Sequence, residues 1–209
     1  MARDEKRRQK ALQKKAAKRK AKKAPRAGTG GGRKPSVPAD APVHECLVPE
    51  ELFEQGLGNV VVARRLPDGH IAAGVFLVDV YCLGVKGAFL ARYTLEEYRH
   101  HMDHLAEIHR LRSEDPAAVR KLVEGAVAYA RDLGIEPHPD YRDARRVFAG
   151  IDADACEREF TYGKDGKPFY VASPRDSALR RKKILQLLER RCGPGGYDYV
   201  LPLDTPPFG

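Results

Sequence analysis

The stretch Gly58–Phe89, GNVVVARRLPDGHIAAGVFLVDVYCLGVKGAF, decides how the chain folds. It holds the densest run of β-branched residues, interrupted once by Pro67-Asp68-Gly69. β-Branched and aromatic side chains suit a pleated, half-buried surface, and Asp-Gly suits a tight turn, so the stretch predicts a β-hairpin with a long second strand. That second strand is apolar on both faces from Ile71 to Val78 and would include Cys82. Such a strand belongs in the middle of a sheet that is covered on both sides.

Helix signals follow the hairpin. Thr94 and Glu97 form a capping-box pattern that predicts a helix with apolar spacing to about His109. Asp115 is a predicted N-cap before a second helix, which ends at Gly134. Further elements are expected at residues 49–56 and 141–148 (short helices), 157–172 (a second hairpin turning at Asp165-Gly166), 174–191 (a helix) and 197–201 (a strand). This order predicts an α+β domain with a mostly antiparallel sheet covered by about four helices.

Charge divides the chain into unequal parts. Residues 1–36 hold 15 Lys and Arg against two acids, a net of +13, whereas the whole chain carries +9, so residues 37–209 carry −4. We expect a disordered polycationic tail at residues 1–24 and a Gly/Pro-rich linker at 25–43. The domain itself is expected at 44–203, followed by a C-terminal extension at 204–209. The protein is therefore a mildly acidic domain preceded by a very basic N-terminal segment, residues 1–36.

Cysteine spacing and hydropathy indicate the compartment. Cys46, Cys82, Cys156 and Cys192 include no CxxC pair, so reduced thiols fit better than a disulfide framework or a zinc knuckle. No apolar run is long enough for a membrane span, and the N-terminus has no apolar core of a secretory signal. The segment GTGGGRK lacks the Lys-Ser/Thr and the flanking strand of a phosphate-binding loop. These features predict a cytoplasmic protein without a cofactor.

Three phrases, FLVDVYCLGVKGAF, AVAYARDLGIEPHPDY and YGKDGKPFYVASPRD, resemble segments of a group of uncharacterised bacterial proteins. The resemblance covers roughly residues 58–200. It implies a bacterial origin and a single recurring domain. It implies no activity, cofactor or catalytic residue.

Two basic segments are candidates for nucleic-acid binding. A Lys/Arg-rich chain gains affinity by releasing counterions from phosphates, independently of sequence. The expected helix after Pro174 has seven basic and two acidic residues from Arg175 to Arg191. Tyr162, Phe169 and Tyr170 could stack on bases beside it, but core packing is the better explanation of these residues. The candidate residues are Lys6, Arg7, Arg8, Lys10, Lys14, Lys15, Lys18, Arg19, Lys20, Lys22 and Lys23 in the tail, and Arg180, Arg181, Lys182 and Lys183 in the helix.

A metal-dependent hydrolase, possibly of the nuclease type, is the alternative. His100 and His104 have the i, i+4 spacing that lets two imidazoles reach one metal ion, and Asp79 with Glu97 could hold magnesium. A third ligand would have to come from Asp79, His70, His138 or Asp140. The opposing interpretation makes the histidines a polar helix flank and places Asp79 at a strand end, satisfied by an Arg or by backbone amides. Asp140 would likewise be a helix N-cap after a stiff Pro-His-Pro turn.

These observations favour an accessory protein that binds nucleic acid or the ribosome through its basic tail, and they favour a non-enzymatic role. The hydrolase is the alternative, and a protein-binding module is a third interpretation. Loss of binding on removal of residues 1–36 would separate the first from the others.

Overall fold

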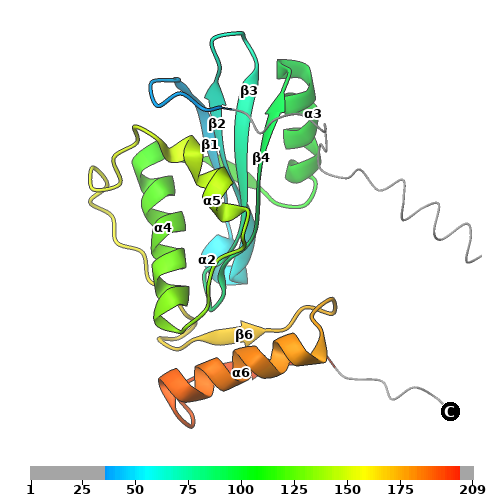
Figure 1. Cartoon of the computed structure of the whole chain (residues 1–209), viewed down its shortest axis with the longest axis vertical. Coiled ribbons are helices and arrows are strands. Elements are labelled where there is room, and N and C mark those ends of the chain that lie inside the picture. Colours follow the sequence, from blue (N-terminus) through cyan, green and yellow to red (C-terminus); the bar gives the residue numbers. More distant parts are fainter. Residues whose placement is uncertain (1–35, 203–209) are drawn as a thin grey trace, which may run out of the picture. The chain divides into compact units, whose positions relative to one another are not determined.

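A computed structural model of the chain describes residues 36–202 (Figure 1). The tail, most of the linker and the C-terminal extension lie outside these residues. The elements are β1 (Val43–Pro49), α2 (Leu52–Gln55), β2 (Leu57–Arg65), β3 (Ile71–Asp79), β4 (Gly84–Tyr93), α3 (Leu95–Ala106), β5 (Leu111–Ser113), α4 (Pro116–Asp132), α5 (Tyr141–Ala144), the 3-10 helix η1 (Arg145–Phe148), β6 (Phe169–Val171), α6 (Ala178–Cys192) and β7 (Asp198–Val200). The mixed α+β class is confirmed.

The predicted hairpin is the centre of a five-stranded sheet. β2 and β3 pair in antiparallel register from Leu57↔Asp79 to Arg65↔Ile71, and Gly69 in the connecting turn has φ +82°. The strand order is β4-β3-β2-β1-β5, and each neighbouring pair is antiparallel. β3 therefore lies between two other strands, as its doubly apolar pattern predicts.

Helices cover both faces of this sheet (Figure 1). On one face, Val60, Val62 and Phe76 pack in a core with residues of α4, α5 and η1. On the other face, Val61 and Val75 pack against α3. The two cores alternate residue by residue along β2 because successive side chains of a strand point to opposite faces.

The long second strand is present as β3, but its expected continuation through Cys82 is wrong, because the chain turns after Asp79. β3 ends at Asp79, and its carboxylate accepts hydrogen bonds from the backbone N–H groups of Tyr81 (3.1 Å) and Cys82 (2.9 Å). Gly84 follows with φ +62° and starts β4, which returns beside β3. The stretch is thus a three-stranded meander, and Cys82 lies buried in a turn. All four cysteines are free thiols.

Two strands were missing from the expectation. β1 occupies residues assigned partly to the linker and partly to the start of the short helix, and it pairs with both β2 and β5. A register shift between Val43 and Glu45 interrupts its alternation. β5 has only three residues, too few for a periodic pattern. The short helix itself is confirmed as α2, which ends at Gly56 with φ +78°.

The second hairpin is wrong apart from its turn. Asp165 (φ +52°) and Gly166 (φ +79°) form the turn. The pairing on either side of it is limited to one isolated bridge between Lys164 and Lys167, and residues 157–162 form no strand. β6 pairs with β7 instead, in parallel. The segment is held elsewhere, since the N–H of Phe169 donates to the Tyr81 carbonyl at 3.1 Å.

The helix caps are largely as predicted. Thr94 and Glu97 form a complete capping box at α3, and the Asp115 carboxylate accepts N–H groups from the first turn of α4. α3 ends at Ala106, short of the expected His109. α6 begins after Ser177, later than expected, because the Asp176 carboxylate folds back onto the Ser173 N–H (2.9 Å). Within residues 36–202, no helix combines the length and the apolar character needed to cross a membrane.

Gly84 offers a test of this meander. An added Cβ would lie 2.7 Å from the Ala126 carbonyl oxygen and 2.8 Å from the Ala130 Cβ, in a left-handed backbone conformation. We expect Gly84→Ala to lower the free energy of unfolding by about 2–3 kcal/mol through steric clash and strain. Gly69→Ala is the matched control, since its φ is +82° but no atom lies within 4 Å of the added Cβ. It should cost only about 1 kcal/mol in urea unfolding, and equal losses would contradict the close approach of α4.

Candidate functional site

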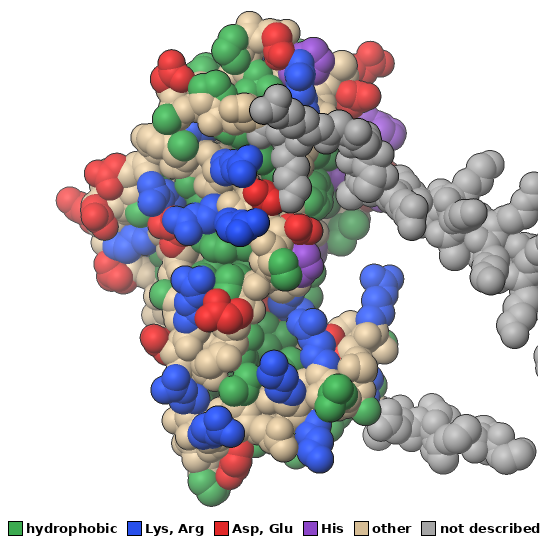
Figure 2. Space-filling view, viewed as in Figure 1, with side chains coloured by type: hydrophobic (Ala, Val, Ile, Leu, Met, Phe, Trp, Pro, Cys, Tyr) green, Lys and Arg blue, Asp and Glu red, His purple; other side chains and the backbone are tan. Residues whose placement is uncertain are grey.

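Charge is segregated within the described residues. Residues 36–163 carry 22 acidic and 14 basic residues, a net of −8, whereas residues 164–202 carry nine basic and four acidic residues, a net of +5. Figure 2 shows Lys and Arg side chains over the part that includes α6, while most Asp and Glu side chains on that face lie over the rest of the domain. The basic residues exposed on α6, here called the α6 surface, are Arg180, Lys182, Lys183, Arg190 and Arg191. This surface accounts for most of the basic residues in residues 164–202.

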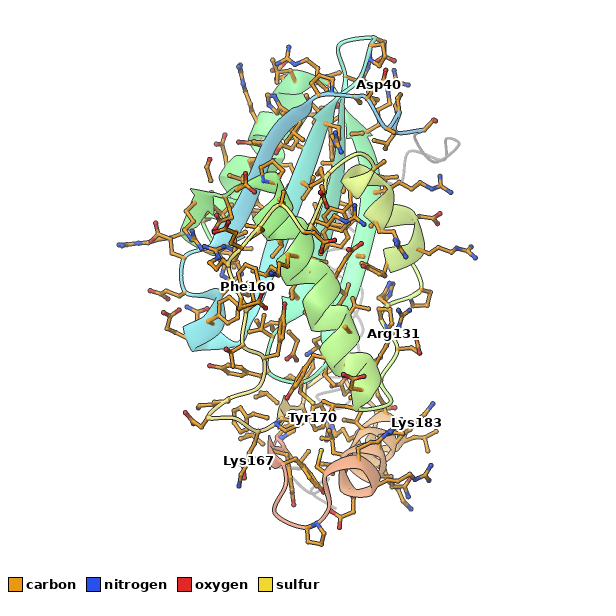
Figure 3. The ribbon with its side chains drawn as sticks, turned by 90° about the vertical axis from the view of Figure 1, so that its left-hand side faces the viewer. Asp40, Arg131, Phe160, Lys167, Tyr170 and Lys183 are labelled. Atoms are coloured by element: carbon orange, nitrogen blue, oxygen red, sulfur yellow. The ribbon has the colours of Figure 1, made fainter. Side chains whose placement is uncertain are left out.

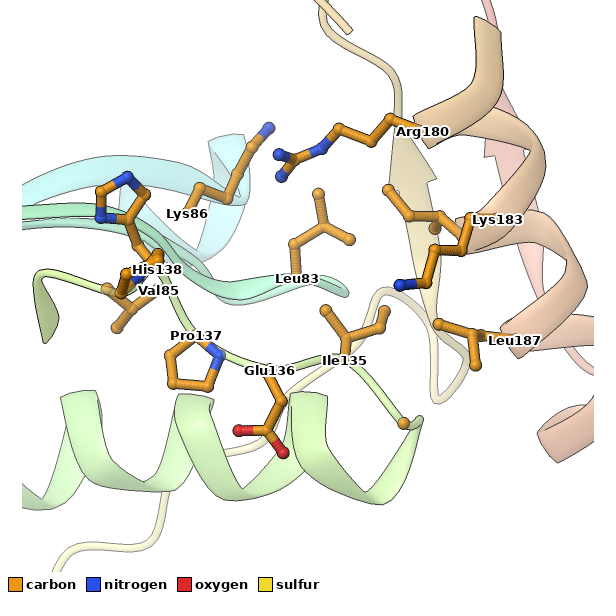
Figure 4. Close-up of a pocket in the computed structure, with 13 residues that line it drawn as sticks. Leu83, Val85, Lys86, Ile135, Glu136, Pro137, His138, Arg180, Lys183 and Leu187 are labelled. Carbon is orange, nitrogen blue, oxygen red and sulfur yellow. The ribbon is translucent and has the colours of Figure 1, made fainter. Parts of the chain in front are cut away.

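A pocket of about 310 Å³ opens beside the α6 surface (Figure 4). It lies between the β3–β4 turn, the loop that follows α4, and α6. Three cationic side chains line it, those of Lys86, Arg180 and Lys183. Its other walls are mostly apolar and come from Leu83, Val85, Gly134, Ile135, Pro137, Pro139, Ile184 and Leu187, with His138 and Glu136 at the edge. We call this cavity the α6 pocket.

A β-bulge delivers Lys86 to the pocket. Leu77 pairs with Gly87 and Val78 with Val85, so Lys86 is the extra residue of β4 and has no partner across the ladder. Its side chain is 13% exposed, and its Nζ lies 3.9 Å from the Asp79 carboxylate. Burial raises the pKa of Asp79, and the Lys86 charge with the backbone N–H groups of the turn opposes that rise.

The two α6 cations of the pocket are held differently. The Arg180 Nε lies 3.3 Å from the Asp176 carboxylate, so this guanidinium is partly neutralised. Lys183 makes no ion pair with a carboxylate of residues 36–202. Figure 4 shows the Lys86 and Arg180 side chains extending toward one another, with Lys183 across the cavity from Pro137. Glu136, the acid at the edge, pairs with Arg131 at 3.2 Å.

The elements that form the pocket are joined by a small apolar core. Buried side chains from the β3–β4 turn, from the end of α4, from β6 and from α6 pack together: Cys82, Leu83, Leu133, Tyr170, Ala172, Ile184 and Leu188. Figure 3 shows Lys183 on α6 and Tyr170 on β6 near the end of α4 that carries Arg131. This core joins α6 to the β3–β4 turn and to the end of α4, the elements between which the pocket lies.

A second basic group, which the sequence did not indicate, lies on α5 and η1. Arg120, Arg142, Arg145 and Arg146 line a shallow hollow of about 380 Å³. Two acids offset part of this charge: Glu124 lies 3.0 Å from Arg120 and 3.8 Å from Arg145, and Asp143 lies 3.1 Å from Arg146. This hollow is therefore a second, partly neutralised basic group.

The structure does not bring the hydrolase candidates together. Asp79 pairs with Gly84 at one end of β3, whereas Ile71 pairs with Tyr93 at the other end. Glu97 lies at that second end, because its carboxylate accepts the Thr94 N–H (2.8 Å). That hydrogen bond lowers the pKa of Glu97. Eight residue steps of a strand separate the two acids by roughly 26 Å, so they cannot share a metal ion.

Of the candidate histidines, only His100 and His104 share a helix. His100 and His104 are exposed on α3, and the His104 Nδ1 lies 3.1 Å from the Glu107 carboxylate. His70 contacts Asp68 at 3.2 Å in the β2–β3 turn. Within the described range, no group of three or more His, Cys, Asp or Glu residues is arranged to hold a metal ion.

The Pro-His-Pro turn and the aromatic residues serve packing. The His138 Nδ1 accepts the Asp140 N–H at 3.2 Å, while the Asp140 side chain makes no capping bond at α5. The Tyr162 hydroxyl donates to the Leu122 carbonyl at 2.8 Å, and Tyr170 is fully buried. Phe169 is half-buried under the Lys164 ammonium, 4.8 Å from its ring centroid. None of the three aromatic rings is presented as an open stacking platform.

Comparisons of the chain with protein-family models, with curated proteins and with solved structures found no match. The candidate site therefore stands on its geometry and charge. The tail residues from Lys6 to Lys23 lie outside the described part of the chain.

Proposed function

We propose that the protein binds the phosphate backbone of nucleic acid, free or within the ribosome, as an accessory protein rather than an enzyme. The observation that carries this proposal is the segregation of charge, +5 over residues 164–202 against −8 over residues 36–163. A basic surface beside an acidic body orients a polyanion, since phosphates are attracted to one side and repelled by the other.

The N-terminal sequence supplies the larger share of the charge. Residues 1–36 carry a net of +13. Cations that neutralise phosphates release condensed counterions, so the resulting affinity is strong, salt-dependent and independent of base sequence. The α6 surface would add contacts from a folded element. It would thereby fix the direction of the nucleic-acid strand relative to the N-terminal tail.

A protein-binding role is the second candidate, and one observation favours it. Large apolar side chains are exposed on α6 and β7: Leu179 is 79% exposed, Tyr199 is 51% exposed and Val200 is 50% exposed. Exposed large apolar side chains are typical of protein contacts when they form a patch. A ribosomal site, which offers both phosphates and protein, would use both features.

The α6 surface can be tested with two charge-neutralising substitutions. Full-length protein carrying Lys182→Gln and Arg190→Gln should bind single-stranded RNA about tenfold more weakly at low salt. The slope of log K against log[salt] should become about 1.4 units shallower, since each lost phosphate contact removes about 0.7. Fluorescence anisotropy over a salt series measures both quantities.

The matched control is Arg99→Gln with Arg110→Gln, two exposed residues in the acidic part of the domain. It makes the same change in net charge, and we expect it to leave the affinity nearly unchanged. Equal losses in the two variants would mean that only total charge matters. No loss in either would remove α6 from the proposed interface.

A further inference from the structure

We propose that the α6 pocket binds a single nucleotide unit, with its phosphate at Lys86, Arg180 and Lys183 and its base and sugar against the aliphatic wall. This inference deepens the proposed function and rests on it. It assigns to the protein a site for one phosphomonoester group, in addition to a diffuse backbone contact.

The cations that line the pocket carry the charge that a doubly charged phosphate needs, with Lys86 and Arg180 close to one another and Lys183 on the other side of Leu83 (Figure 4). Arg180 and Lys86 each have one carboxylate behind them, Asp176 at 3.3 Å and Asp79 at 3.9 Å, which position their side chains. Lys183 has no such partner among residues 36–202, so its charge is not neutralised there. Charge-assisted hydrogen bonds from several cations strengthen in a partly desolvated cavity.

A bulge and a helix bring these cations to the pocket. Lys86 is the unpaired residue of the β4 bulge, which aims its side chain out of the ladder. Arg180 and Lys183 lie three residues apart on α6 and therefore on neighbouring positions of one helix face. The side chain of Lys182, between them, lines a different hollow that faces Leu185 and Tyr197.

The rest of the pocket is suited to an organic group. Leu83, Ile135, Pro137 and Leu187 give it an aliphatic wall, and its volume is about 310 Å³. Small-molecule sites commonly measure about 300–1,000 Å³, so one compact ligand fits, whereas a duplex does not. Inorganic phosphate would contact the cations but would leave the aliphatic wall exposed to water.

Two sources could supply this chemistry, a free mononucleotide or the 5′-phosphorylated end of a strand. Both present a phosphomonoester next to a sugar and a base. A phosphodiester inside a strand has one negative charge fewer and is flanked on both sides, so it suits the α6 surface better than the pocket.

The test uses full-length protein and four probes: adenosine 5′-monophosphate, adenosine, and one single-stranded RNA oligonucleotide with and without a 5′-phosphate. We expect the monophosphate to bind measurably and adenosine to bind at least about tenfold more weakly, because the charged contacts are lost. Isothermal titration calorimetry or anisotropy competition gives the affinities. A preference for the 5′-phosphorylated strand would identify the strand end as the source, and its absence the free nucleotide.

Lys183→Gln is the informative variant, because Lys183 is exposed and its replacement leaves the core intact. It should weaken binding of the monophosphate roughly tenfold or more. Lys182→Gln is the matched control, which should weaken the unphosphorylated strand and leave the monophosphate unaffected. If the monophosphate does not bind, or if both variants weaken it equally, the pocket is not a nucleotide site. Binding of the unphosphorylated strand in that case would leave the proposed function standing.

Discussion

Full-length protein in which eleven basic residues of the N-terminal tail are replaced by glutamine should bind single-stranded RNA roughly a hundredfold more weakly at about 50 mM salt. The basic side chains of the tail gain affinity for RNA because they neutralise its phosphates and release the condensed counterions. Neutral glutamine side chains cannot do this. If about half of the replaced positions contact phosphates, the slope of log K against log[salt] should become shallower by about 4. The replaced residues are Lys6, Arg7, Arg8, Lys10, Lys14, Lys15, Lys18, Arg19, Lys20, Lys22 and Lys23.

The control keeps the charge and changes the side chain, by replacing the lysines of the same segment with arginine. Its affinity and slope should match those of the natural protein, because the effect depends on charge. Unchanged binding by the glutamine variant would contradict the proposed role of the N-terminal tail. Urea unfolding separates binding of nucleic acid from ion pairing within the protein. If the cations of the tail pair with acids of residues 36–163, the glutamine variant should also have a lower free energy of unfolding. We expect no such loss.

Local signals predicted the parts of the fold that local physics determines. The Asp-Gly turn produced the β2–β3 hairpin, and the Thr94–Glu97 and Asp115 caps placed the starts of α3 and α4. In each case the residues that form the feature are neighbours in the chain. The end of β3 escaped prediction because the sequence stays apolar through Cys82, and only the Asp79 carboxylate and Gly84 turn the chain.

The features that the sequence did not predict depend on contacts between residues far apart in the chain. The residues expected to form a second hairpin carry a suitable turn, yet β6 finds its partner in β7, beyond α6. The α6 pocket has the same character. Lys86 and Lys183 line one pocket only because the β3–β4 turn packs against α6. The sequence spacing places Glu97, His100 and His104 on one helix, but it could not show that Asp79 lies at the far end of β3.

The buried Arg64 should be the residue of the described domain most sensitive to substitution. It is 4% exposed, and its guanidinium donates to three backbone carbonyls: Val147 through Nε at 2.8 Å, Ala41 through Nη1 at 2.5 Å, and Ala149 through Nη2. It thereby ties the segment before β1 and the end of η1 to β2. Arg64→Met keeps the aliphatic stem but leaves these carbonyls without donors, and we expect a loss of about 3–5 kcal/mol in the free energy of unfolding.

Arg65→Met is the matched control for urea unfolding. Arg65 is the next residue of β2, points to the opposite side and is exposed, so its replacement should change the free energy of unfolding by no more than about 0.5 kcal/mol. Arg64→Lys should fall between the two, because a single ammonium keeps the charge but cannot reach three carbonyls in different directions. If Arg64→Met were no more damaging than Arg65→Met, water would have to satisfy the freed carbonyls. The segment before β1 would then be held by the burial of Ala41 and by β1 pairing rather than by Arg64.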